Sequence, residues 1–157
     1  MIKYDKQDVL EHIIEKVNDA TKTAQDSAMR ARQAAIDAPG RNQSRYDCTK
    51  EEQSYLADAL NIRGEQLSRE ALILRRLHLP SNPERVDVGS LIYTADTFGL
   101  NYYFILPNSG GETVEMNDGK EVMVMTPESP LAREMIGKRK GDAFLFKGNV
   151  YTVLDLK

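Results

Sequence analysis

Few residues of this 157-residue chain are spaced for chemistry of their own. Neither His12 nor His78 has carboxylates at metal-ligand spacing beside it, which is typical of surface histidines and not of a metal site. The single cysteine, Cys48, follows Asp47, whose charge disfavours a thiolate nucleophile. Ser109-Gly110-Gly111 is too short for a phosphate-binding loop and lies in the wrong context. We therefore expect no catalytic residue, no metal and no cofactor.

Charged residues cluster between Arg30 and Lys50, a segment that contains five basic and two acidic residues. The whole chain nevertheless has a net charge of -3. It is therefore not a general nucleic-acid binder, because such proteins neutralise phosphates with a basic surface. The cluster is either a solvated loop, the usual case, or a contact surface. Its members are Arg30, Arg32, Arg41, Arg45 and Lys50, with Asp37 and Asp47.

Composition limits the class of protein. An apolar content of 41% excludes a fully disordered chain, and 29% charged residues exclude a membrane protein. No apolar run approaches the roughly 20 residues that span a bilayer, and the first residues lack the apolar segment of a signal peptide. One cysteine permits no internal disulfide. We expect a cytoplasmic protein of one compact domain or two small ones.

The first half has helical periodicity. Apolar residues at steps of three and four predict a helix from Asp8 to about Ala38, which Pro39-Gly40 ends. A second helix is predicted from about Thr49 to His78. Arg63 interrupts its apolar stripe, and we expect this side chain to snorkel outward. Gly64 destabilises the helix by roughly 1 kcal/mol relative to alanine. The first stripe consists of Leu10, Ile13, Val17, Ala20, Ala24, Ala28, Ala31 and Ala35, and the second of Leu56, Leu60, Arg63, Leu67, Ala71, Leu74 and Leu77.

Two helices of similar length joined by a polar loop favour an antiparallel two-helix coiled-coil hairpin. Neither narrow stripe could build a globular core, so we predict that residues 1–79 project as a finger. The stripe of the first helix turns to alanine alone, which buries little area and makes that end the less stable one. Residues 80–85, with prolines at 80 and 83, form a linker.

Residues 86–157 have the period of strands and predict a small antiparallel sheet with one short helix, so the fold class is α+β. Ser129 is the predicted N-cap of that helix, Pro130 its first residue and Gly137 its end. Gly148-Asn149 marks a two-residue hairpin. The predicted strands are Val86–Thr94, Asn101–Leu106, Glu121–Met125, Ala143–Lys147 and Val150–Leu156.

Two segments of the sequence resemble the motifs of a known protein family. The run from Met125 to Lys138, continuing to Gly141-Asp142, resembles the Ser-Pro-(Leu/Ile)-x-x-x-(Leu/Met)-(Leu/Ile)-Gly-Lys signature in the C-terminal, FKBP-like domain of the Gre transcript-cleavage factors. Asn42–Gln53 is similar to the same family's stretch at the base of the second helix, sharing the tyrosine, the basic residue, the following glutamate and the final glutamine. The resemblance covers nearly the whole chain, and the first match is the firmer one.

The resemblance implies a factor that binds the core enzyme of RNA polymerase. Its sheet domain would dock at the rim of the secondary channel, and its finger would reach towards the catalytic magnesium, with indirect contact to nascent RNA. Thr126, Pro127, Glu128, Ser129 and Pro130 would form the exposed docking edge. The plain alternative is that Ser129-Pro130 only begins a helix and Gly137-Lys138 only ends it. We expect a monomer with no membrane attachment.

The sequence departs from the family at the tip. Gre factors carry an Asp and a Glu there, two carboxylates that help to hold a second magnesium and to orient water for RNA hydrolysis. Aligned on Tyr46, those positions are Pro39 and Asn42, and neither supplies a carboxylate. The sequence therefore predicts a factor that enters the channel without stimulating cleavage and modulates transcription by occupancy. The predicted tip residues are Asp37, Arg41, Asn42, Arg45, Tyr46 and Asp47.

Three other functions remain open from the sequence. Asp37 and Asp47 could replace the missing acidic pair, which would make the chain a cleavage-stimulating elongation factor. The sheet domain could be an FKBP-like prolyl isomerase or chaperone module, although isomerases of this fold include a tryptophan in their pocket and this chain has none. A purely structural coiled-coil dimer would not explain the Pro39-Gly40 break.

Overall fold

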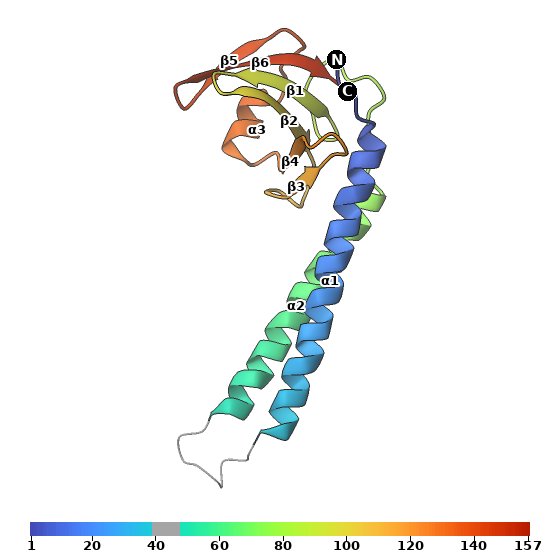
Figure 1. The fold of residues 1–157 in the computed structure, drawn as a ribbon, viewed down its shortest axis with the longest axis vertical. Coiled ribbons are helices and arrows are strands. Elements are labelled where there is room, and N and C mark those ends of the chain that lie inside the picture. Colours follow the sequence, from blue (N-terminus) through green and yellow to red (C-terminus); the bar gives the residue numbers. More distant parts are fainter. Residues whose placement is uncertain (39–47) are drawn as a thin grey trace. The chain divides into compact units, whose positions relative to one another are not determined.

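The computed structural model describes residues 1–38 and 48–157 (Figure 1). Two long helices precede a sheet that carries one short helix, which confirms the predicted α+β class. The elements are α1 Lys6–Asp37, α2 Thr49–Arg75, β1 Leu91–Asp96, β2 Gly99–Ile105, β3 Thr113–Glu115, β4 Glu121–Met125, α3 Pro130–Met135, β5 Ala143–Phe146 and β6 Asn149–Leu156. In the parts of the chain that are described, no helix has the length and apolar character needed to cross a membrane.

The chain divides into two compact units. One comprises residues 15–72, which are the greater part of the helical hairpin. The other comprises residues 1–14 together with residues 73–157. The base of the predicted finger over residues 1–79 is therefore part of the sheet unit. The stretch predicted as a linker, residues 80–85, lies within that same unit.

Small residues line the contact between α1 and α2, which run antiparallel side by side (Figure 1). The stripe predicted for α1 is buried except at Ala20, which is exposed. In α2 the predicted stripe was wrong at two positions, because Leu56 and Arg63 point outward while Ala57 and Gly64 are buried. The physical reason is size, since alanine and glycine allow two helices to approach more closely than leucine does. The buried residues are Val17, Ala24, Ala28, Ala31 and Ala35 of α1 and Ala57, Gly64, Leu67 and Ala71 of α2.

The position of Arg63 follows from this shift of the stripe. Its guanidinium lies 3.8 Å from Glu70 Oε1, on the solvent side of α2. The predicted snorkelling from within the apolar stripe is therefore unnecessary. Gly64 takes the inward place, where a Cβ atom would lie 3.5 Å from Gln25 Cγ and 3.8 Å from Ala24 Cβ.

The six strands form one sheet in the order β3-β4-β2-β1-β6-β5. Four of the five strand pairs are antiparallel, but β2 and β4 are parallel, so the sheet is mixed where an antiparallel one was predicted. The intervening β3 has only three residues, too few for a periodic signal, and was not predicted. The stretch predicted as strand from Val86 starts only at Leu91, because the Val86 backbone bonds Gly137 and Lys138 instead.

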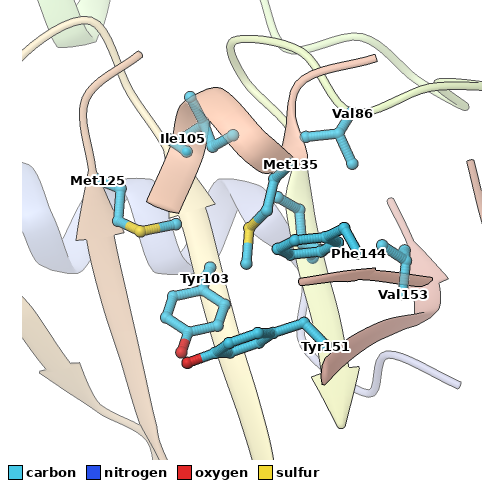
Figure 2. Packing of buried hydrophobic residues seen from close by; sticks show 10 residues of the cluster. Val86, Tyr103, Ile105, Met125, Met135, Phe144, Tyr151 and Val153 are labelled. Atoms are coloured by element: carbon cyan, nitrogen blue, oxygen red, sulfur yellow. The ribbon is translucent and has the colours of Figure 1, made fainter. Parts of the chain in front are cut away.

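The main core of the sheet unit lies between α3 and one face of the sheet (Figure 2). Ala132 and Met135 are the buried side chains of α3, and Met135 reaches towards the rings of Tyr103 and Phe144. The Phe144 and Tyr151 rings stack with centroids 5.4 Å apart. Burial raises the pKa of Tyr103 to about 12, so this core keeps that hydroxyl neutral at all ordinary pH values. The other members are Val86, Ile92, Ile105, Met125 and Val153.

Thr94 is a polar exception in β1. Its side chain is fully buried, and its hydroxyl has no hydrogen-bond partner among the residues that the structure describes. The residue follows directly on a shift of register between β1 and β6. A buried hydroxyl without a partner costs about 1–3 kcal/mol of desolvation, so β1 contains a local weakness.

The first prediction concerns that hydroxyl. We expect Thr94→Val, which keeps the side-chain shape, to raise the free energy of unfolding by about 1 kcal/mol. Urea unfolding followed by circular dichroism measures this change. The matched control is Thr97→Val, which removes an exposed hydroxyl that donates to Asn149 Oδ1 (3.2 Å) and should not stabilise the protein. A Thr94→Val protein less stable than wild type would show that the hydroxyl has a partner.

The second prediction concerns the close approach of the helices. Gly64→Ala should stabilise the protein by up to about 1 kcal/mol, because alanine favours the helix and its Cβ fits at ordinary contact distance. Gly64→Leu should instead destabilise it, because a large side chain cannot fit between α1 and α2. Thermal unfolding of both variants decides the matter, and a gain in stability for the leucine variant would contradict the packing described here.

Candidate functional site

The predicted docking edge, residues 126–130, connects β4 to α3. Ser129 is the N-cap, as predicted, and its Oγ accepts a hydrogen bond from the Ala132 backbone N–H (3.3 Å). The Ser129 N–H donates to the Thr126 carbonyl (3.0 Å), which closes a turn before the helix. Glu128 and Pro130 are exposed, and the other three residues are half-buried. The segment is therefore a fixed edge that presents Glu128 and Pro130 to solvent.

A second loop supports this edge from behind. A Cβ atom on Gly110 would lie 2.8 Å from Thr126 Cγ2 and 3.3 Å from the Thr126 backbone N, so only glycine fits there. The Gly111 N–H donates to the Val124 carbonyl (2.9 Å), which fastens the loop to the end of β4. The sequence excluded a phosphate-binding loop at residues 109–111 but did not connect these residues with Thr126. No periodic or motif signal links these two segments.

The residues of the Met125–Lys138 run that follow the edge have structural roles in the sheet unit. Ala132 and Met135 enter the core, and Gly137 has a φ of 82°, which favours glycine. The Gly137 N–H donates to the Val86 carbonyl (2.8 Å), so the end of the signature is tied to the segment that precedes β1. Only Glu128, Arg133 and Glu134 of this run add exposed charge near the edge. The inward residues therefore have structural roles in forming and ending the helix, and a docking role concerns only the outward residues.

Asp37 is the only predicted tip residue that the structure describes. It is the last residue of α1, it is exposed, and the Gln33 side-chain amide donates to both of its oxygens (3.0 and 3.1 Å). The other predicted tip residues, Arg41, Asn42, Arg45, Tyr46 and Asp47, lie outside the described residues, as does Pro39. Cys48 is exposed immediately before α2.

The start of the chain is bound to the sheet by polar contacts that the sequence did not indicate. The Ile2 N–H donates to Asp155 Oδ2 (2.7 Å), and Lys140 Nζ donates to Asp155 Oδ1 (2.6 Å). The Tyr4 hydroxyl donates to Asp118 Oδ1 (2.6 Å), and its ring packs edge-on against that of Tyr102. Residues 1–4 are thus fastened to both the last strand and the turn before β4.

These contacts shift the titration of both carboxylates. The hydrogen bond from Tyr4 lowers the pKa of Asp118. Burial alone would raise the pKa of Asp155, but the hydrogen bonds from Lys140 and the Ile2 N–H outweigh it and lower the pKa overall. A carboxylate with a lowered folded pKa contributes stability that is complete at neutral pH and is lost as the pH falls through that value. The anchored start of the chain is therefore an acid-sensitive part of the sheet unit.

Comparison with known proteins gives no family assignment. No protein-family model matches the sequence, and no curated protein matches it. Among solved structures, the crystal structure of GreA factor homolog 1 (Gfh1) of Thermus thermophilus is 18% identical, with 94% of each chain covered and a TM-score of 0.35. A structure described as the transcription factor Gfh1 is 15% identical, with 94% of this chain and 92% of that chain covered and a TM-score of 0.37. Both TM-scores are below 0.5, so neither likeness carries an argument about this chain.

The third prediction tests the support of the docking edge. Gly110→Ala should destabilise the protein by about 1–3 kcal/mol, because the new methyl group meets Thr126 Cγ2 at 2.8 Å. Adding Thr126→Ser removes that Cγ2 atom and should restore part of the loss, which urea unfolding of the single and double variants measures. Equal losses in Gly110→Ala with and without the serine would contradict a direct contact between the two loops.

Proposed function

We propose that this chain is a transcription factor of the Gre type that binds the core enzyme of RNA polymerase and has no catalytic activity of its own. The sheet unit docks at the rim of the secondary channel through the edge at residues 126–130. The hairpin enters the channel and modulates transcription by occupying it. The observation that carries the proposal is the run from Met125 to Lys138, which matches the Gre signature in register.

The structure supports this proposal through the different roles of that run. Its inward residues form α3 and the core, while Glu128 and Pro130 remain exposed on a rigid turn. Loop residues held by a rigid scaffold are a common basis for binding. A helical hairpin and a small sheet domain in this order are also the parts that docking and insertion require.

The absence of cleavage stimulation is proposed from the tip. Two carboxylates are needed to help hold a second magnesium, and Pro39 and Asn42 occupy their aligned positions. Asp37 keeps a carboxylate near the tip, but both of its oxygens accept from Gln33 at the end of α1. A single carboxylate that is already hydrogen-bonded within its own helix does not provide the two carboxylates that such a metal site needs. We therefore propose that the chain regulates transcription by occupying the channel.

The fourth prediction tests docking. The purified chain should bind bacterial core RNA polymerase and should displace a labelled Gre factor from it, measured by fluorescence anisotropy. Glu128→Lys should weaken binding about tenfold, because it reverses an exposed charge on the docking edge. The matched control is Glu115→Lys, an exposed residue of β3 that pairs with the first residue of β4 and so lies away from the edge, which should leave affinity within about twofold. No binding, or binding without competition, would sink the proposal.

The same preparation distinguishes regulation from cleavage. Addition of the chain to backtracked elongation complexes should release no short 3′ RNA fragments. Release of such fragments, and their loss in Asp37→Asn, would instead make the chain a cleavage-stimulating factor.

A further inference from the structure

A groove runs along one flank of the helical hairpin, between α1 and α2. Ala35 and Ala57 are buried at its floor, where small side chains leave space between the helices. Two adjoining hollows of about 380 Å³ and about 640 Å³ share Arg32 and Asp58, so they form one continuous groove. We name it the flank groove. It is lined by Gln25, Arg32, Ala35 and Ile36 of α1 and by Lys50, Ser54, Ala57, Asp58, Asn61, Ile62 and Glu65 of α2, all within the hairpin unit.

The charged side chains of the flank groove are arranged in order along it. Lys50 lies in the first turn of α2, and Glu65 lies about 22 Å further along the same helix, at 1.5 Å per residue. Arg32 and Asp58 lie between them, where the two hollows meet, and neither forms an ion pair among the described residues. Glu65 lies 3.5 Å from Arg69, but both are exposed, and such a pair contributes little. The groove is therefore positive at one end and negative at the other.

This order of charges is complementary to itself when a second copy is turned end over end. The midpoint between Lys50 and Glu65 falls at Ala57 and Asp58, in the middle of the groove. A two-fold axis at this level therefore brings Lys50 of each copy opposite Glu65 of the other. It also brings Arg32 of each copy near Asp58 of the other. A different partner would need both charges in the same order and at the same spacing, so the charge pattern favours a second copy.

Exposed apolar side chains follow the same symmetry. Met29 is 69% exposed and Ile36 70%, and they lie two turns apart on α1, on either side of Arg32. Steps of three and four residues place both on the same side of α1 as Gln25 and Arg32, which line the groove. Because Arg32 lies at the level of Asp58, the same axis brings Met29 of one copy near Ile36 of the other. The second copy thus covers apolar surface as well as charge.

We propose that the flank groove is the interface of an antiparallel homodimer, in which the hairpin of a second copy lies on the first with its tip pointing the opposite way. The overlapping helices pack as a short four-helix bundle. The overlap is about 22 Å long and about 20 Å wide, the width of two helices, which is a small interface. We therefore expect a weak dimer, with a dissociation constant in the micromolar range. The dimer differs from the monomer expected from the sequence.

The dimer does not depend on the proposed function, because it concerns only contacts between copies of this chain. If the chain also inserts its hairpin into RNA polymerase, the two uses exclude each other, because a second pair of helices covers the flank groove. Dimerisation would then keep the chain out of the channel at high concentration. A test without polymerase separates the two proposals.

A charge exchange tests the interface with the full chain, kept reduced so that Cys48 forms no disulfide. Sedimentation equilibrium over about 1–500 µM should show the wild type passing from monomer to dimer. Lys50→Glu and Glu65→Lys should each weaken dimerisation at least about tenfold, because each places like charges opposite one another. The double variant should recover the wild-type affinity to within about threefold. Because the two side chains lie about 22 Å apart in one chain, only contact between copies explains this recovery.

A mixture of the two single variants gives an independent result. The Lys50→Glu chain is acidic at both positions and the Glu65→Lys chain is basic at both, so the mixture should dimerise at a concentration where neither does alone. Ile36→Glu should weaken the dimer at least about tenfold. The matched control is Arg63→Glu, two residues from Glu65 and so on the opposite side of α2, which should change affinity by less than about twofold. All four residues are exposed, so the variants should keep the wild-type circular dichroism spectrum.

A distance measurement determines the direction of the second copy. An antiparallel overlap centred at Asp58 places the two Cys48 residues about 30 Å apart, which pulsed electron resonance of spin labels on Cys48 measures. A separation below about 20 Å would mean a parallel pair and would overturn the proposal. So would a wild type that stays monomeric at the highest concentration, even if this flank binds another protein. Failure of both the double variant and the mixture to dimerise, or dissociation by Arg63→Glu as strong as by Lys50→Glu, would overturn it equally.

Discussion

The polar contacts that fasten residues 1–6 to the sheet and to the segment after α2 are the interactions on which the rest of the structure depends. Lys6, at the start of α1, is buried, and its ammonium group donates to the carbonyl oxygens of Pro80 and Gly89. Burial, together with the nearby charge of Lys157, lowers the pKa of Lys6. Lys157 Nζ in turn donates to the Tyr4 carbonyl (3.1 Å). These contacts join the beginning of the chain, the segment after α2 and the last residue, and they make the hairpin base part of the sheet unit.

The hairpin beyond its base depends on small side chains. Alanines and Gly64 bring α1 and α2 close, but each buries little apolar area, so helix propensity and close contact must compensate. Such a hairpin remains slender, because it has no volume for a core of its own. A pair of closely packed helices without a bulky core suits insertion into a narrow channel, which is the use proposed for it.

Local patterns predicted the parts of the fold that depend on local sequence. The Ser129 cap, the Pro130 start and the Gly137 end of α3 follow from preferences that act within a few residues. The parallel pairing of β2 with β4 could not be predicted, because it depends on which distant strands meet. The α2 stripe was misplaced at Leu56 and Arg63 because leucine was taken as the inward residue, whereas close packing selected Ala57 and Gly64. For the candidate site, the signature predicted a docking edge at residues 126–130, and its docking role stays a prediction. The support of that segment by Gly110 and the anchoring of Tyr4 to Asp118 could not be predicted, because they are contacts between distant segments.

Insertion of the hairpin into the secondary channel is the central claim, and the chain provides a probe for it. Cys48 is the only cysteine, is exposed, and immediately precedes α2. An iron chelate attached to Cys48 cuts nearby polypeptide by hydroxyl radicals, so the fragments of core RNA polymerase locate this residue in the complex. The account predicts cuts in the segments that surround the catalytic magnesium. Cuts confined to the outer surface of the polymerase, or no cuts beyond those of the unlabelled chain, would contradict it.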